Sequence, residues 1–294
     1  MLLNSCQMQG DADIQTMREL IRHLPDQAGI DDFEEMIQLE SVKATVRLWQ
    51  SGHRLAGFAF VDDYNNLILA MDPELITDEL ETEIFAWGAF CMRERNLQTG
   101  RLDTLDASCS RDNIQRIRLL ERHRFKQCDL RTLRYARSLD EPIVEYPLPP
   151  GFSLRCALGE HEAEQLAALH RAAFGSDHMT VEYRLAIMRA PQYDAELDLV
   201  VIDPNGEMAA FCICGLEEGQ DQVGYTDPIG THPRYQKMGL GKAVVTAGFQ
   251  ALRNRGVKTV ELGTSSENIA MQCLAESLGF KLVSERLWFA LKVD

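Results

Sequence analysis

The chain has 294 residues, of which 45% are hydrophobic and 7% aromatic, and its formal net charge is −15 at pH 7. That length is enough for two domains, each with a core of its own. The acidic balance argues against nucleic acid as the main partner and is compatible with a cationic amine substrate or with plain solubility. No apolar run approaches the roughly 18 residues of a membrane span, and the first residues lack a signal peptide's basic and apolar regions, so a cytoplasmic protein without a membrane partner is expected.

The first half of the chain contains four segments that recur later in the same order. They are "GHRLAGFAFVDD" at 52–63, "MDPELITDELETEIFAWGAF" at 71–90, "CSRDNIQRIRLLERHRFK" at 109–126 and "DLRTLRYAR" at 129–137. The last of them is expected to be a strand that closes this half.

A break follows at "SLDEPIVEYPLPPG", residues Ser138 to Gly151. Four prolines and several acids in so short a stretch are typical of an extended linker rather than a packed element. The sequence therefore predicts a first domain over 1–140, a linker over 141–151 and a second domain over 152–294.

The second half alternates strands with helices and includes hairpins, which favours an α/β fold with a mixed sheet. An Asn-Gly pair in "PNGE" marks one hairpin turn. Strands are expected at 152–157, 197–203, 208–216, 223–233, 258–264 and 282–293, and helical segments at 160–175, 181–190, 240–257 and 268–280.

The eight cysteines are scattered without metal-ligand spacing, so no metal site is expected. Cys212 and Cys214, in "FCICG", alternate like neighbours on one face of a strand. Buried free thiols are the expected state of these cysteines.

The two halves are best explained as copies of one fold. Segments of the same kind follow one another in the same order, and single residues match at the same spacing. The matches are Phe58 with Phe211, Pro73 with Pro233, Asn113 with Asn268, and Phe125 with Phe280.

Two glycines, Gly239 and Gly241, stand in "QKMGLGK" where a helix is about to begin. Several backbone N–H groups are expected there, the helix dipole favours negative charge, and no glycine side chain would block an anion. The spacing is that of neither a P-loop nor a dinucleotide-binding fingerprint.

In its context this stretch resembles the acyl-coenzyme A binding segment of the GNAT superfamily of N-acyltransferases, whose pattern Gln/Arg-x-x-Gly-x-Gly/Ala is met by residues 236–241. The later "SSENIAMQCLAESLGFK" resembles the family's next motif, an Asn near a helix start and a closing Leu-Gly-Phe. The resemblance covers Phe152 to Asp294 and, more faintly, the first half. It implies two tandem GNAT-like domains, each a mixed, mainly antiparallel sheet flanked by helices, an architecture that some members such as mycothiol synthase share.

The resemblance also implies acetyl-CoA as co-substrate. Its pyrophosphate would lie on the amides of the glycine segment, and its pantetheine arm would pair with the preceding strand like an extra strand. The cofactor-binding residues implied are Ile229, Gly230, Thr231, Gln236, Lys237, Met238, Gly239, Leu240, Gly241, Lys242 and Ala243, with Asn268 holding the pantetheine arm or fixing its helix.

An amine must lose a proton before it attacks a thioester, so a carboxylate near that strand is wanted as general base. In "GYTDPIG", Tyr225, Asp227 and Ile229 would share one face of a regular strand. Asp227 is the predicted base; it could equally be a capping or bulge aspartate beside Pro228. Glu261, on the next strand, is the second candidate.

Many family members carry a tyrosine, as general acid for the leaving thiolate, where this chain has Ala275. Cys273 lies nearby but is expected to face the core, and Tyr225 is the predicted replacement. The acid is also dispensable in principle, because a thiol with a pKa near 8.5 leaves readily as thiolate.

In the first copy the matching stretch reads "PELITDELETE". Its glycines are absent, and the acids there would repel a pyrophosphate, so this copy is expected to be degenerate. These acids are Asp78, Glu79, Glu81 and Glu83.

Two functions remain open at this point. One is an N-acetyltransferase that acts on a primary amine of a small molecule by direct attack in a ternary complex. The other is a non-catalytic acyl-CoA sensor or scaffold. Neither the acceptor, the acyl chain length nor the oligomeric state follows from the sequence.

Overall fold

A computed structural model describes residues 3–24, 30, 32–216 and 222–293. The packing of the backbone divides the chain into two compact units. Unit 1 holds Met1–Arg131 with Arg286–Asp294, and unit 2 holds Thr132–Glu285. Each has strands flanked by helices, which confirms the predicted α/β class. Within the described ranges no helix is long and apolar enough to span a bilayer, and no three His, Cys, Asp or Glu side chains are grouped as metal ligands.

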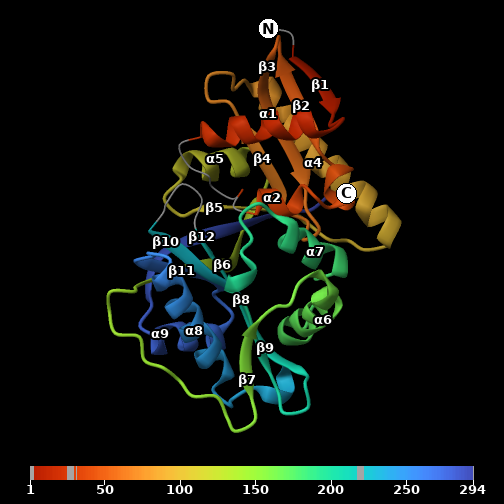
Figure 1. The fold of residues 1–294 in the computed structure, drawn as a ribbon. Helices are drawn as coiled ribbons and strands as arrows, with labels where there is room; N and C mark the ends of the chain where they lie inside the picture. Colours follow the sequence, from red (N-terminus) through yellow and green to blue (C-terminus); the bar gives the residue numbers. More distant parts are fainter. Residues whose placement is uncertain (1–2, 25–29, 31, 217–221, 294) are drawn as a thin grey trace. The chain divides into compact units, whose positions relative to one another are not determined.

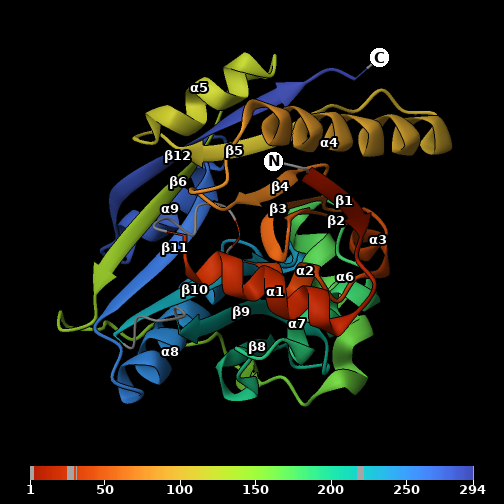
Figure 2. The same cartoon turned by 90° about the horizontal axis from the view of Figure 1, so that it is seen from above.

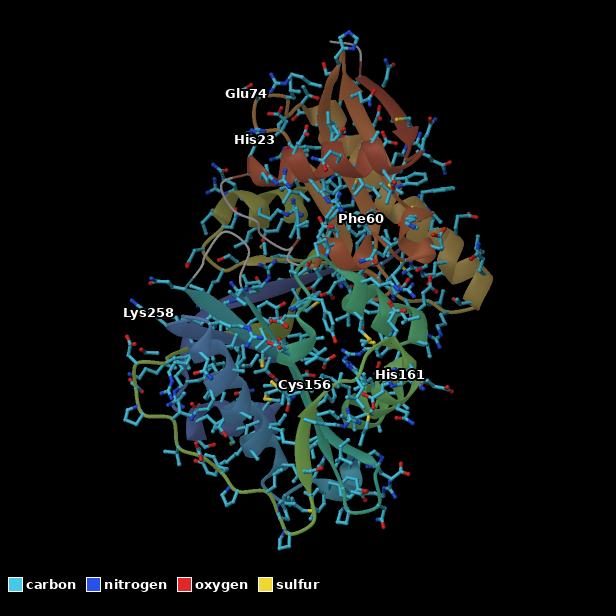
Figure 3. The ribbon with its side chains drawn as sticks, viewed as in Figure 1. His23, Phe60, Glu74, Cys156, His161 and Lys258 are labelled. Carbon is cyan, nitrogen blue, oxygen red and sulfur yellow. The ribbon has the colours of Figure 1, made fainter. Side chains whose placement is uncertain are left out.

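Unit 1 is built on an antiparallel sheet whose strands follow chain order. They are β1 (Leu3–Gln7), β2 (Arg47–Ser51), β3 (Arg54–Val61) and β4 (Leu67–Met71), and β5 (Leu105–Ser110) follows later in the chain. Its helices are α1 (Asp11–Arg22), α2 (Phe33–Met36), α3 (Glu40–Lys43), α4 (Asp78–Thr99) and α5 (Ile114–Arg122). Figure 2 shows α1 and α4 on opposite sides of β2–β4. Phe60, fully buried, stacks on Phe58 in this core (Figure 3).

Unit 2 has a sheet that begins with β7 (Ser153–Cys156), β8 (Asp198–Ile202), β9 (Met208–Leu216), β10 (Val223–Thr231) and β11 (Thr259–Ser265), in that order. Only the β10–β11 pair among these is parallel. In Figure 1, α6 (Ala163–Phe174) and α7 (Val181–Arg189) lie on one side of this sheet, and α8 (Leu240–Asn254) and α9 (Ile269–Ser277) lie on the other. Among the described residues of this unit, 3₁₀ turns lie at Glu160–Glu162, Ala195–Leu197 and Pro233–Tyr235.

Most segments expected in the second half are therefore confirmed, because each carries a local signal. The Asn-Gly turn joins the antiparallel β8 and β9. Cys212 and Cys214 do lie on one face of β9, with their sulfur atoms 3.5 Å apart and both side chains buried. Cysteines within the described residues are free thiols.

The closing strands of the two halves are exchanged between the units. Residues 132–138 of β6 (Lys126–Ser138) pair antiparallel with β11 in unit 2. Residues 286–291 of β12 (Lys281–Leu291) pair antiparallel with β5 in unit 1. The exchanged segments also supply buried core residues, Leu133 and Tyr135 to unit 2 and Leu287 and Phe289 to unit 1. The sequence reading placed each closing strand in its own half, and pairing between distant segments decides otherwise.

The predicted linker, 141–151, is irregular as expected, but it is packed rather than loose. Ile143, Tyr146 and Leu148 rest against the core of unit 2. Arg137, at the end of β6, donates to the carbonyl of Pro142 at 2.7 Å. Just before the linker, Leu139 N donates to the carbonyl of Lys258 at 2.7 Å. The boundaries of the compact units thus differ from those of the predicted domains, 1–140 and 152–294. The predicted domains remain a prediction about which residues make up each duplicated copy.

The strand exchange predicts that cutting the linker will not release two independent halves. A protease site inserted between Glu145 and Tyr146 would, once cleaved, leave two fragments that each hold a core strand of the other unit. We expect the nicked protein to elute as one species from a sizing column and to separate only in denaturant. Separation under native conditions would contradict the exchange, and the uncut protein is the control.

Candidate active site

The strands β10 and β11 run together for only three residues. Val223, Gly224 and Tyr225 pair in parallel with residues 259–261. Beyond that point β10 pairs with β9 and β11 pairs with β6. From Thr226 to Thr231, none of the described strands pairs with the edge of β10 that is turned away from β9. We call this separation of β10 from β11 the divergence.

A β-bulge lies in β10 at the divergence. Thr226 pairs with Cys214 and Ile229 with Cys212, so that Asp227 and Pro228 together oppose one residue of β9. The extra residue shifts the alternation of side chains. Ile229 consequently lies on the core face together with Cys212, whereas Tyr225 lies on the opposite face. The expectation that Tyr225, Asp227 and Ile229 share a face is wrong, because it assumed a regular strand.

Asp227 lies at the apex of the divergence. Its side chain is exposed, and its Oδ2 accepts a hydrogen bond from Gly263 N at 3.3 Å. Gly263 is the second residue of β11 beyond the last residue that pairs with β10. The carboxylate thus accepts a hydrogen bond from a β11 amide just beyond the point where the pairing of β10 with β11 ends, which is the role expected of an aspartate in a bulge. It also places a negative charge at the mouth of the divergence.

Glu261 and Tyr225 lie on the same face as Asp227. Glu261 is the direct partner of Tyr225 in the parallel pair, and partners in a ladder share a face. Its Oε2 lies 3.4 Å from Nε of Arg134, a residue of β6. The structure therefore brings all three predicted catalytic residues together on the face opposite α8 and α9.

The ring of Tyr225 crosses to the other neighbouring strand. A Cβ built on Gly215, its partner in β9, would lie 2.3 Å from both Cζ and Oη of Tyr225. The phenol therefore lies over β9, on the side of β10 away from the divergence. No residue with a side chain fits at position 215 while the ring occupies this place.

The start of α8 leaves backbone amides without partners inside the helix. Its N-cap is Gly239, at φ 85°, and no side chain caps it. The first amide in the helical ladder is that of Ala243, which donates to Gly239 O at 3.1 Å. The amides of Leu240, Gly241 and Lys242 precede it and point out of the helix end. An anion would find donors and a favourable dipole there.

The end of β10 lies beside the start of α8. A Cβ built on Gly241 would lie 3.6 Å from Oγ1 of Thr231 and 3.6 Å from a methyl of Leu274, which is ordinary contact. The protein itself therefore tolerates alanine at 241, in line with the Gly/Ala of the predicted pattern. Gln236, Lys237 and Met238 form the exposed loop between them, with Lys237 at φ 63°.

The same loop is anchored to the β8–β9 hairpin. The hydroxyl of Tyr235 donates to Oδ2 of Asp203 at 2.8 Å. Burial alone would raise the pKa of Asp203, but the amides of Glu207 and Asn205 and the Tyr235 hydroxyl donate to its carboxylate and lower that pKa to about 2. The anchor therefore stays charged at neutral pH. Sequence reasoning missed this pair, which no motif marks.

Asn268 is the N-cap of α9, and its Oδ1 accepts from Met271 N at 3.1 Å. Asn113 caps α5 in the same way, accepting from Arg116 N at 2.9 Å. Helix capping thus accounts for the matched asparagines, and contact of Asn268 with pantetheine stays a prediction. Ala275 is fully buried in the core. Cys273 is exposed, so the expectation that it faces the core is wrong.

The corresponding helix start in unit 1 is already capped. Oγ1 of Thr77 accepts from Leu80 N at 3.1 Å at the start of α4. Asp78, Glu79 and Glu81 occupy the first turn, and Glu81 pairs with Arg122 at 2.7 Å. The acids that the sequence singled out therefore take the favourable end of the helix dipole themselves.

One further group on the face of Tyr225 was missed from the sequence. His170 of α6 stacks on Phe211, whose ring lies against Gly230 of β10. Burial, with the charge of Arg184, lowers the pKa of His170 to about 4, so the imidazole is neutral at pH 7. In the sequence it is one polar residue of an amphipathic helix, which gives no signal of its position.

A family profile and several curated sequences match part of this chain. A sequence profile described as "Acetyltransferase (GNAT) family" matches residues 163–280. Mycothiol acetyltransferase of Salinispora tropica is 33% identical over 151 residues, 49% of either chain. That of an Arthrobacter species is 30% identical over 148 residues, 48% of this chain and 46% of its own. The chain thus spans about half the length of these curated relatives.

Two solved structures match the fold over nearly the whole chain. A GCN5-related N-acetyltransferase from Sphaerobacter thermophilus has a TM-score of 0.67 at 18% identity, covering 99% of this chain and 96% of its own. A tandem GNAT protein from the clavulanic acid biosynthesis pathway has a TM-score of 0.71 at 15% identity, covering 100% and 99%. The chain therefore has the fold of a tandem GNAT protein, and its residues 163–280 match the acetyltransferase (GNAT) family profile.

Proposed function

We propose that this protein is an N-acetyltransferase that moves the acetyl group of acetyl-CoA to a primary amine of a small molecule. The observation that carries the proposal is that unit 2 contains both the divergence and the uncapped start of α8. Unit 1 has a capped and acidic helix at the corresponding place. The curated relatives, which match about half of this chain, are mycothiol acetyltransferases.

In the proposed complex, acetyl-CoA lies along β10 and ends at α8. The amides of Leu240, Gly241 and Lys242 would donate to the pyrophosphate. The unpaired edge of β10 at Ile229–Thr231 would bond the pantetheine amides as an added strand does. Lys237 and Lys242 add positive charge beside the loop, although the whole chain carries −15.

Acetyl transfer then needs an amine that has lost its proton and a thioester within reach. Asp227 is the proposed base, because its exposed carboxylate lies where β10 and β11 separate. Its bond to the Gly263 amide holds the carboxylate in place. Glu261 is the second candidate, although its carboxylate is already engaged by Arg134. In direct attack, nitrogen bonds to the carbonyl carbon, the C–S bond breaks and free thiol is released.

The departing thiolate needs no strong acid. The sequence predicts Tyr225 as its proton donor, in place of the tyrosine that Ala275 replaces. That assignment stays a prediction, and the phenol lies over β9. The buried Ala275 is also the observation that favours the second candidate function, a non-catalytic acyl-CoA sensor or scaffold. Release of free thiol from acetyl-CoA in the presence of amines separates the two, since a sensor binds without turnover.

The first test of the proposal is the number of cofactor sites. Calorimetric titration with acetyl-CoA should give about one site per chain, because of the two corresponding helix starts that of α8 has no side-chain cap and that of α4 is capped and acidic. Gly239→Asp combined with Gly241→Asp should abolish binding, since it places bulk and negative charge at the pyrophosphate. Gly241→Ala is the control and should retain it. Two equivalent sites, or full affinity in the Asp variant, would refute the assignment.

The second test concerns the base. Asp227→Asn keeps an oxygen that can accept from Gly263 N, so fold and acetyl-CoA affinity should be preserved. The value of kcat/KM should fall by about 10²- to 10⁴-fold, the usual contribution of a general base. The acidic limb of the wild-type pH–rate profile should report one ionisation that is missing from the variant.

Glu261→Gln is the matched comparison for Asp227→Asn. If Glu261→Gln loses activity and Asp227→Asn does not, Glu261 is the base and Asp227 is only the bulge aspartate. If neither matters, the amine arrives deprotonated and the site works by holding thioester and amine together.

A further inference from the structure

We infer that Tyr225 is a binding platform for the acceptor, and that the acceptor is an amine carrying an aromatic or other flat apolar group. The inference rests on the proposed function and names the class of amine. In this inference Tyr225 acts through its ring, which binds the acceptor, rather than through its hydroxyl.

The position of the ring is the first observation. Cζ and Oη of Tyr225 occupy the space that a side chain at Gly215 would fill, so the ring lies across the sheet instead of standing out from it. Tyr225 nevertheless remains partly exposed. A ring held flat on the backbone of a neighbouring strand offers a large apolar surface at little loss of conformational freedom.

The direction of the phenol is the second observation. Gly215 belongs to β9, whereas the divergence opens between β10 and β11. The hydroxyl therefore points away from the edge of β10 along which the pantetheine is proposed to lie. A proton donor to the thiolate would need the opposite direction.

The surroundings of the ring fit an amine with an apolar end. Ile213, two residues before Gly215 on the same face of β9, is buried and apolar. On the other side of Tyr225 are the carboxylates of Asp227 and Glu261, where an ammonium group would be held. Arg134 also lies on this face, and its charge is engaged by Glu261.

The positions of the ring and the carboxylate suggest the shape of the acceptor. The ring of Tyr225 lies over β9, whereas the carboxylate of Asp227 lies at the opposite edge of β10, toward Gly263 of β11. A flat group stacked on that ring and an ammonium at Asp227 therefore need a flexible spacer between them. We therefore expect 2-phenylethylamine to be a better acceptor than benzylamine, and both to be better than 1,4-diaminobutane.

The test separates the ring from the hydroxyl. With acetyl-CoA and 2-phenylethylamine, Tyr225→Phe should keep the KM for the amine within about 3-fold, because the ring that forms the platform remains. Tyr225→Leu should raise the KM for the amine about 10-fold, as expected for a lost aromatic contact, with the KM for acetyl-CoA unchanged. If Tyr225→Phe instead loses kcat, the hydroxyl acts as the acid and the inference is overturned.

Gly215→Ala gives a second and independent route to the same effect. The new methyl group would displace the ring, so this variant should match Tyr225→Leu. The double variant should be no worse than either single one, since both remove the same platform. Cys214→Ala is the matched control, because this neighbouring side chain faces α8 on the other side of the sheet. Additive losses, or unchanged kinetics in Gly215→Ala, would overturn the platform.

Failure of the proposed function gives a different result. If no amine releases thiol from acetyl-CoA, the acetyltransferase proposal fails. The platform is then tested by calorimetric titration of 2-phenylethylamine into the wild type and Tyr225→Leu. Binding that Tyr225→Leu weakens supports the platform, and absence of binding or equal binding overturns it.

Discussion

The candidate site depends on one constraint, which is that backbone amides and carbonyls need partners wherever a strand ladder ends. Parallel pairing between β10 and β11 stops at Tyr225. The bulge at Asp227 and Pro228 turns β10 while keeping it paired with β9, and the Asp227 carboxylate satisfies the amide of Gly263. The edge of β10 beyond this point can bond a ligand as a further strand would. The position of the Asp227 carboxylate and the unpaired edge at Ile229–Thr231 thus both follow from one interruption of the sheet.

The two copies show how small changes at a helix start alter its chemistry. In unit 2, Gly239 caps α8 without a side chain, and the amides of the first turn remain available. In unit 1, the hydroxyl of Thr77 and the acids of the first turn occupy the same part of α4. The start of α4 is thus stabilised by the chain's own carboxylates, whereas the start of α8 has free amides that favour an anion such as the proposed cofactor. The asparagine caps of α5 and α9 are alike, because they serve the fold in both copies.

The exchanged strands tie the site to the whole chain. The strand that flanks β11 comes from β6, and it supplies Arg134, which engages Glu261 beside the candidate base. The first half of the chain therefore contributes a side chain to the candidate site in unit 2. Arg137, on the same strand, fixes the start of the linker to unit 2. Removal of the first half would take away this strand, so its retention has a structural reason.

The sequence by itself determined what local signals carry. The helix that begins after Gly239, the Asn-Gly hairpin and the alternating cysteines each depend on neighbours within a few residues, and the structure confirms all three. The tertiary structure alone decided the strand exchange, the packed linker, the exposure of Cys273, the face of Ile229 and the direction of the Tyr225 ring. These depend on pairing between distant segments and on a one-residue bulge, and a single residue inserted in a strand reverses every face beyond it. Position 215 is an example of what the sequence alone cannot show. It requires glycine because the ring of Tyr225, ten residues away in the chain, fills the space of a side chain there.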